Sequence, residues 1–205
     1  MPLPWLVALV VSGQVALGIS PKADRMTWAL ENVPVWLGLF ILAFTQRRFP
    51  LSALCLHLFA LHSIILAFGG HYTYAKVPLG DWVRDAFGLA RNHYDRVGHF
   101  AQGFIPAIFV RELLLRKTPL QRGGWLNFLT VCVCLAFSAG YEFFEWWTAL
   151  LTGEAATDFL GTQGDPWDTQ WDMFMAFVGA TCAVLSLGGR HDESLKKVCV
   201  PPAGA

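Results

Sequence analysis

The sequence predicts an all-α, polytopic membrane protein: a helical bundle of about six transmembrane helices, with a short amphipathic helix on its outer surface. Hydrophobic residues make up 55% of the 205 residues, and charged residues make up only 15%. Soluble domains carry about 25% charged residues. A helix that spans the hydrocarbon core needs about 20 mostly apolar residues, and the chain contains a series of segments of about that length.

The predicted spans follow one another without a second domain. They cover residues 4–19, 26–45, 51–68, 93–115, 125–151 and 169–187. We therefore expect one integral membrane domain over residues 1–190 and a disordered cytoplasmic tail over 191–205. Between the third and fourth spans Gly and Pro interrupt regular structure. Residues 81–89 then mix large apolar side chains with Asp81, Arg84 and Asp85, which is typical of an amphipathic helix on a membrane surface.

Basic residues in the short connections predict the orientation, because cytoplasmic connections carry an excess of Lys and Arg. Alternate connections and the C-terminal segment hold Arg47, Arg48, Arg116, Lys117, Arg122, Arg190, Lys196 and Lys197. These regions and both termini are therefore predicted to be cytoplasmic. The connection between the last two spans, residues 152–168, has no Lys or Arg and is predicted to lie outside.

Carboxylates inside the predicted spans give the strongest functional signal. They are Glu31, Asp95, Glu142, Glu145 and Asp172. A charged group at the bilayer centre costs roughly 2.5–3.5 kcal/mol on insertion scales, and such groups usually mark functional sites. All five fall near the predicted outer side. Residues four apart share a helix face, so His99 is expected to lie on the same face as Asp95. The sequence therefore predicts a polar site on the extracytoplasmic side.

Carboxylates gathered at one depth repel one another, so they must take up protons, pair with cations or bind a metal. Oxygen ligands with one or two imidazoles suit a divalent ion such as Mg, Mn or Zn. We predict that Asp95, His99 and Glu142 hold the metal. Glu145 or Asp172 would act as the general base of catalysis.

Other polar residues are expected to bind the substrate. They are His71, Tyr72, His93, Arg96, Asp165, Asp168 and Glu31. Two of these, Asp165 and Asp168, are also candidates for the N-cap of the last span. At the other side, Glu112 is expected to form an ion pair with Arg111 or Arg116. The balance of 15 basic and 15 acidic residues argues against a nucleic-acid partner.

Several runs resemble the YjdF-like family of bacterial inner-membrane proteins. They are GHYTY at 70–74, HYDRVGHF at 93–100, YEFFEW at 141–146 and GTQGDPWDTQWDM at 161–173. The resemblance implies a multi-pass protein of the bacterial inner membrane. The order Asp95-x-x-x-His99, a Glu pair in the next helix and then Asp172 is more distantly similar to the VanZ-like superfamily. Its link to glycopeptide resistance implies envelope lipids or peptidoglycan precursors.

Three classes of function stay open on these observations. The leading hypothesis is a metal-assisted enzyme that hydrolyses or transfers a group on a membrane lipid or lipid-linked envelope substrate. A small proton- or ion-coupled transporter would use the same carboxylates, although transporters usually have longer chains built from repeats. The third class is a non-catalytic binder of an envelope lipid.

Overall fold

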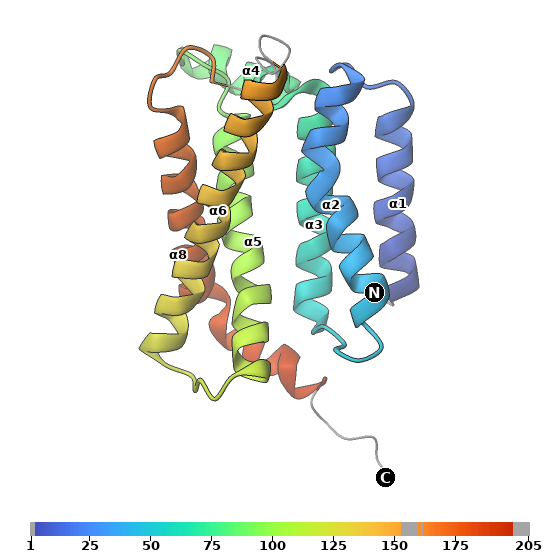
Figure 1. Cartoon of the computed structure of the whole chain (residues 1–205), viewed down its shortest axis with the longest axis vertical. Coiled ribbons are helices and arrows are strands. Elements are labelled where there is room, and N and C mark those ends of the chain that lie inside the picture. Colours follow the sequence, from blue (N-terminus) through green and yellow to red (C-terminus); the bar gives the residue numbers. More distant parts are fainter. Residues whose placement is uncertain (1–2, 153–159, 161, 199–205) are drawn as a thin grey trace.

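The computed structural model describes residues 3–152, 160 and 162–198, and these residues form helices and no strands. Figure 1 shows a bundle of long helices that run roughly side by side. The helices are α1 (Leu3–Ile19), α2 (Arg25–Thr45), α3 (Ala53–Tyr72), the 3-10 turn η1 (Tyr74–Lys76), α4 (Pro78–Phe87), α5 (Tyr94–Lys117), α6 (Gly124–Thr152) and α8 (Asp168–Lys196). The all-α prediction is confirmed.

Among the described residues, four helices are long and apolar enough to cross a membrane, namely α2, α3, α6 and α8. α1 is apolar but has 17 residues. α5 has 24 residues, yet it carries Asp95, Arg96, Arg111 and Glu112, all of them buried. It packs against α3, α6 and α8, so its neighbours cover these charges. Several of the described helices could therefore span a membrane, and the number of six spans stays a prediction.

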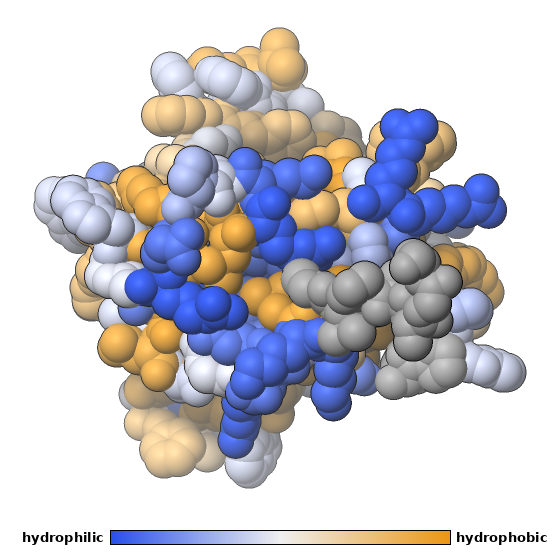
Figure 2. Space-filling view, turned by 90° about the horizontal axis from the view of Figure 1, so that it is seen from below, coloured by the Kyte–Doolittle hydropathy of each residue, from blue (hydrophilic) through white to orange (hydrophobic). Residues whose placement is uncertain are grey.

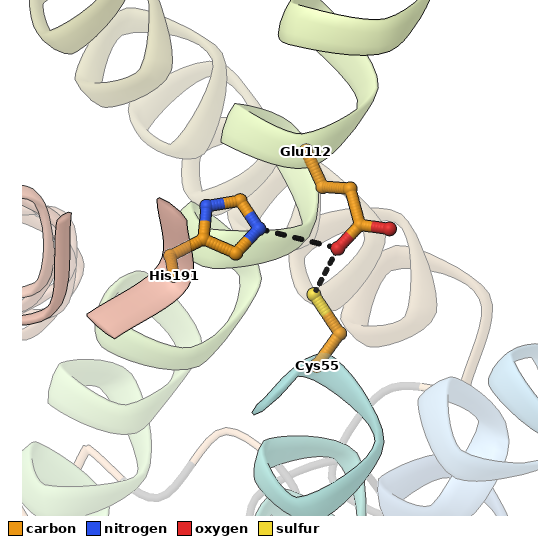
Figure 3. A group of neighbouring side chains, drawn as sticks. All are labelled: Cys55, Glu112 and His191. Atoms are coloured by element: carbon orange, nitrogen blue, oxygen red, sulfur yellow. Dashed lines mark hydrogen bonds and ion pairs between the residues drawn. The ribbon is translucent and has the colours of Figure 1, made fainter. Parts of the chain in front are cut away.

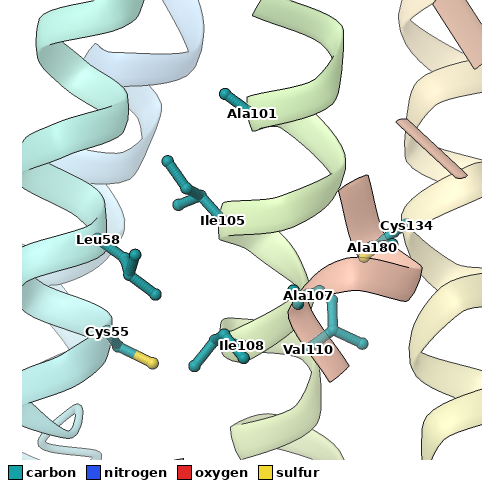
Figure 4. Packing of buried hydrophobic residues seen from close by; sticks show 10 residues of the cluster. Cys55, Leu58, Ala101, Ile105, Ala107, Ile108, Val110, Cys134 and Ala180 are labelled. Carbon is teal, nitrogen blue, oxygen red and sulfur yellow. The ribbon is translucent and has the colours of Figure 1, made fainter. Parts of the chain in front are cut away.

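Two hydrophobic cores divide the bundle, and α3 contributes to both. The first joins α1, α2 and α3 through residues such as Leu6, Val35 and Leu56. The second joins α3, α5, α6 and α8, with Ile105 and Ile108 of α5 at its centre (Figure 4). α2 packs mainly on α3. The molecule thus has an α1–α3 lobe and an α5–α6–α8 lobe.

α5 and α8 form the most extensive helix pair of the bundle. Two glycines permit their close approach. A Cβ atom added at Gly103 would lie 1.9 Å from the carbonyl oxygen of Ala176, and one added at Gly179 would lie 2.1 Å from that of Phe100. Because neither position has room for a side chain, this crossing fixes the separation of the helices that carry Asp95, His99 and Asp172.

The predicted amphipathic helix is present as α4, at the end of the bundle where α5 and α8 begin (Figure 1). It starts before the predicted residue 81 because Pro78 occupies its first turn, where proline is favoured. Gly88 ends it with a left-handed backbone, φ 62°. Leu79, Trp82 and Phe87 are exposed on its apolar face. We call this end of the bundle the α4 end.

The opposite end carries the C-terminal part of α8 and exposed basic side chains. Figure 2 looks onto this end and shows hydrophilic side chains spread across it. Exposed basic residues here include Arg47, Lys117 and Arg122. The predicted tail boundary at residue 190 falls inside α8, which continues to Lys196 with His191 fully buried. The polar residues that follow residue 190 thus extend the helix, and the predicted disorder of 199–205 lies outside the described residues.

Candidate metal site

Asp95, His99 and Asp172 meet near the α4 end. Asp95 lies in the first turn of α5 and His99 one turn later on the same face, while Asp172 comes from the beginning of α8. All three are buried, and one ligand atom of each lies within 4.8 Å of the others. The Nε2 atom of His99 is 3.6 Å from Asp95 Oδ1 and 3.8 Å from Asp172 Oδ1. Two carboxylates therefore face one ring nitrogen.

A hydrogen bond to Gln102 sets the orientation of the His99 ring. Nδ1 lies 2.9 Å from Gln102 Oε1. An amide oxygen only accepts hydrogen bonds, so Nδ1 donates, and in the neutral ring Nε2 then holds the lone pair. A metal-ligating histidine typically donates its other N–H in this way. A lone pair that faces two carboxylates is repelled by them unless a proton or a metal ion lies between.

Glu142 of α6 lies on the other side of the imidazole. Its Oε1 atom is 4.0 Å from His99 Nδ1. This oxygen is buried and has no hydrogen-bond partner among the described residues. The predicted ligand set of Asp95, His99 and Glu142 therefore differs in one member from the group around Nε2, where Asp172 stands. The Oε1 atom of Glu142 can therefore bind a proton, a water molecule or a second ligand.

An ionic layer lies over these residues and joins α5 to the start of α8. Nitrogens of Arg91 and Arg96 are 2.7 and 2.6 Å from Asp168 Oδ1. Both guanidiniums are also 3.3 Å from Asp165, and Arg96 donates to Asp172 as well. The predicted substrate contacts Arg96, Asp165 and Asp168 are therefore paired with one another. The N-cap position of α8 is occupied by Trp167, without a side-chain cap.

Two further carboxylates approach this cluster from different lobes. Glu31 of α2 is buried, and Glu145 of α6 is half-buried. The charge of Asp95 acts on both of them. All five carboxylates predicted from the sequence therefore belong to one electrostatic neighbourhood.

The remaining predicted contacts do not join the cluster. His71 Nδ1 lies 2.8 Å from the carbonyl oxygen of Leu17, so this ring donates to the end of α1. Tyr72 packs edge-on against His71, with centroids 4.6 Å apart. His93 is exposed at the N-cap position of α5. The chain places these side chains beside the loops of the α4 end rather than against His99.

A second group of possible ligands, which the sequence analysis missed, lies toward the opposite end. Cys55 Sγ and His191 Nε2 are each 3.2 Å from Glu112 Oε2 (Figure 3). The three side chains come from α3, α5 and α8 and are fully buried. The pairing of Glu112 with a basic side chain was predicted, and Arg116 fills that role at 2.6 Å. Only the helical continuation of α8 could have indicated the third member, His191.

The hydrogen bonds of this second group argue against a metal. Arg111 Nη1 is 2.7 Å from His191 Nδ1, and a guanidinium can only donate. Nδ1 therefore accepts, and Nε2 carries the proton that it donates to Glu112. This is the reverse of the arrangement at His99. Glu112 also accepts from the backbone N–H of Ser52 at 3.1 Å. The group is a closed network that fixes the start of α3 against α5 and α8.

Comparison with known proteins places the chain in a membrane family. No solved structure matches it. It is 49% identical over 180 residues to the inner membrane protein YjdF of Escherichia coli (strain K12), which covers 88% of this chain and 86% of the relative. The resemblance to YjdF-like proteins is thereby confirmed, and the VanZ-like resemblance stays a prediction. Residues 3–193 match the family described as predicted membrane protein (DUF2238), and the chain belongs to that family.

Proposed function

We propose that this protein is a metal-dependent membrane enzyme that hydrolyses or transfers a group on a lipid or lipid-linked envelope substrate at the extracytoplasmic side. One observation carries the proposal. The Nε2 atom of His99 faces Asp95 and Asp172, while Nδ1 is hydrogen-bonded to Gln102. An imidazole held in this way between two carboxylates is a ligand set for a divalent ion such as Mn or Zn, and also for Mg.

The roles of the residues follow from their positions around His99. Asp95, His99 and Asp172 would hold the metal, which would polarise the substrate and lower the pKa of a bound water. Glu142 keeps a buried oxygen without a partner among the described residues, so it can take a proton from that water. Glu145 is half-buried at the edge of the cluster and can pass the proton outward.

The level of the cluster along the bundle favours a lipid substrate. Exposed tryptophans surround the same end, among them Trp82 of α4, Trp146 of α6 and Trp171 of α8. Tryptophan concentrates at membrane interfaces, and Trp146 lies one turn from Glu142. The cluster would therefore lie just inside the interface, at the depth of lipid headgroups and ester groups. The basic residues of the opposite end support the proposal that this end faces the cytoplasm.

Metal analysis of the purified protein tests the proposal. Protein prepared without chelators should hold a stoichiometric divalent metal, and His99→Ala should lose it. Cys55→Ser keeps a donor to Glu112 and should retain the metal, which makes it the matched control for the second group. Wild-type protein without bound metal after supplementation with Mn or Zn would refute the proposal.

A topology reporter tests the side of the membrane. A reporter that is active only in the periplasm should work when inserted near residue 157 and should fail after Lys197. The opposite result would place the cluster on the cytoplasmic side and remove the argument for an envelope substrate.

A proton-coupled transporter is the second candidate, and one observation favours it. Glu31 and Asp95 belong to different lobes, and their charges act on each other. Protons on such carboxylates could couple a movement of the lobes to transport. The metal analysis separates the two functions, because a transporter of this kind needs no stoichiometric metal.

A further inference from the structure

A groove lies between α1 and α3 in the α1–α3 lobe. It encloses about 90 Å³ and is lined by apolar side chains such as Leu9, Leu17 and Phe68. Sites for drug-sized ligands are larger, about 300–1,000 Å³, so this groove fits a slender chain of methylene groups. Gly13 also lines it, and a Cβ atom added at this position would meet no atom within 4 Å. The groove is therefore open at Gly13.

The polar side chain of Gln14 lines the same groove and carries an unpaired donor. Gln14 is 7% exposed, and its Nε2 atom is buried without a hydrogen-bond partner among the described residues. Trp36 of α2 fixes the orientation of the amide, because its Nε1 atom lies 3.2 Å from Gln14 Oε1. An indole N–H only donates, so the atom that it contacts is the amide oxygen. The amide nitrogen is the atom that is left for a ligand.

The groove does not supply an acceptor for this nitrogen. Ser63 of α3 also lines it, but its hydroxyl donates to the carbonyl oxygen of Phe59 at 2.8 Å, and no hydrogen bond joins Ser63 to Gln14. Buried donors in proteins are normally satisfied. A ligand that fits the groove therefore combines an apolar chain with an acceptor oxygen opposite Gln14.

The outer face of α1 is suited to contact with lipid. Val11, Val15 and Ile19 are exposed along it, and α1 packs against α3, which is long and apolar enough to cross a membrane. α1 ends at Ile19, at the α4 end of the bundle (Figure 1). Gln14 lies five residues earlier, about 7 Å along the helix axis. The ester groups of a lipid join the headgroup to the acyl chains, so they lie near this depth.

We propose that the groove binds one acyl chain of a membrane glycerolipid, and that the ester carbonyl of this chain accepts a hydrogen bond from Gln14 Nε2. The apolar walls contact the methylene groups, and the amide donor recognises the carbonyl oxygen. The inference does not depend on the proposed function, because the groove lies between α1 and α3, whereas the proposed metal ligands belong to α5 and α8.

Binding of two synthetic lipids to the delipidated, full-length protein tests the inference. The probes are dioleoyl phosphatidylglycerol and a counterpart in which ether linkages replace both esters, so that the headgroup and the chain length are unchanged. Native mass spectrometry counts the lipids bound in detergent over a titration. Wild-type protein should bind the first diester molecule about three- to tenfold more tightly than the first diether molecule, which is the effect of one hydrogen bond.

Two variants separate the donor from the groove, and a third is their control. Gln14→Met removes the amide donor but keeps the length of the side chain, so it should bind the two lipids equally. Gly13→Leu fills the groove and should lose the tight binding of the diester. Gly140→Leu makes the same substitution at an exposed position of α6, where an added Cβ also meets no atom within 4 Å. It should bind both lipids as the wild type does.

Several outcomes would overturn the proposal. Equal binding of the two lipids by wild-type protein is expected if a water molecule satisfies Gln14. An unchanged preference for the diester in Gln14→Met or Gly13→Leu would show that the lipid binds elsewhere. A dimer that Gly13→Leu converts to a monomer would identify a second copy of the chain as the occupant. If Gly13→Leu fails to fold, the comparison of Gln14→Met with wild-type protein decides the question.

Discussion

Replacing Gly179 by alanine should disturb the metal site from two helical turns away. The added Cβ would lie 2.1 Å from the carbonyl oxygen of Phe100, whereas ordinary contacts begin at 3.4 Å. α8 must therefore move from α5 by about 1.3 Å. The neighbouring atoms are backbone, which cannot rotate away. Overpacking of this kind typically costs about 1–3 kcal/mol.

The same displacement should reach the ligands. Asp172 lies on α8 seven residues before Gly179, about 10 Å along the helix, and α5 carries Asp95 and His99. Metal sites require ligand distances within about 0.2 Å, so a shift of α8 should lower metal affinity by tenfold or more. Gly140→Ala is the matched control, because a Cβ at Gly140 meets no atom within 4 Å. It should be neutral or stabilising by up to about 1 kcal/mol.

Thermal unfolding in detergent and metal affinity measured on the same preparations check this prediction. If Gly179→Ala matches Gly140→Ala in both measurements, then the α5–α8 crossing does not set the geometry of the site. A variant that is less stable but keeps its metal affinity would show that the crossing supports the fold alone.

Two other substitutions test the ionic layer and a helix cap. Arg96→Ala should destabilise the protein by about 3 kcal/mol, since it leaves the buried carboxylate of Asp172 without its arginine and Asp168 with Arg91 alone. A loss below about 1 kcal/mol in unfolding by detergent titration would contradict the pairing. Asp24→Ala should cost about 1 kcal/mol, because the carboxylate caps α2. The hydrogen bond from the Thr27 hydroxyl lowers the pKa of Asp24 below 3.8. The contribution of the cap to stability is therefore present above pH 3.8 and is lost as the pH falls through the lowered pKa. A difference in stability between wild type and Asp24→Ala that does not shrink in acid would contradict this role.

Helical spacing predicts which polar residues share a face, and this part of the site follows from the sequence. Asp95 and His99 lie four apart on α5, and both face Asp172 of α8. Spacing along one helix does not give the rotation of that helix against its neighbours. Asp172 rather than Glu142 therefore stands at Nε2 of His99, which depends on how α8 packs against α5.

Hydropathy predicts helical membrane segments less well when neighbouring helices cover the polar residues of a segment. α5 is the central helix of its lobe. Because it carries several charged residues, it is not among the helices that composition alone identifies as membrane spans. The polar end of α8 was predicted to be a tail for the same reason. His191 is buried there because Glu112 and Arg111 of α5 supply hydrogen bonds, and such long-range partners leave no local pattern in the sequence.

The two buried histidines show how identical side chains acquire different uses. His99 donates through Nδ1 to an amide oxygen and turns Nε2 toward two carboxylates. His191 accepts at Nδ1 from a guanidinium and donates through Nε2 to Glu112. In the first arrangement the nearby guanidinium of Arg96 contacts Asp172 and not the ring, whereas in the second Arg111 donates directly to the ring. α5 and α8 contribute residues to both groups, and these helices cross at Gly103 and Gly179. The group around His191 has a complete set of hydrogen bonds. The group around His99 has more carboxylates than positively charged partners. The proposed metal site therefore lies at the α4 end.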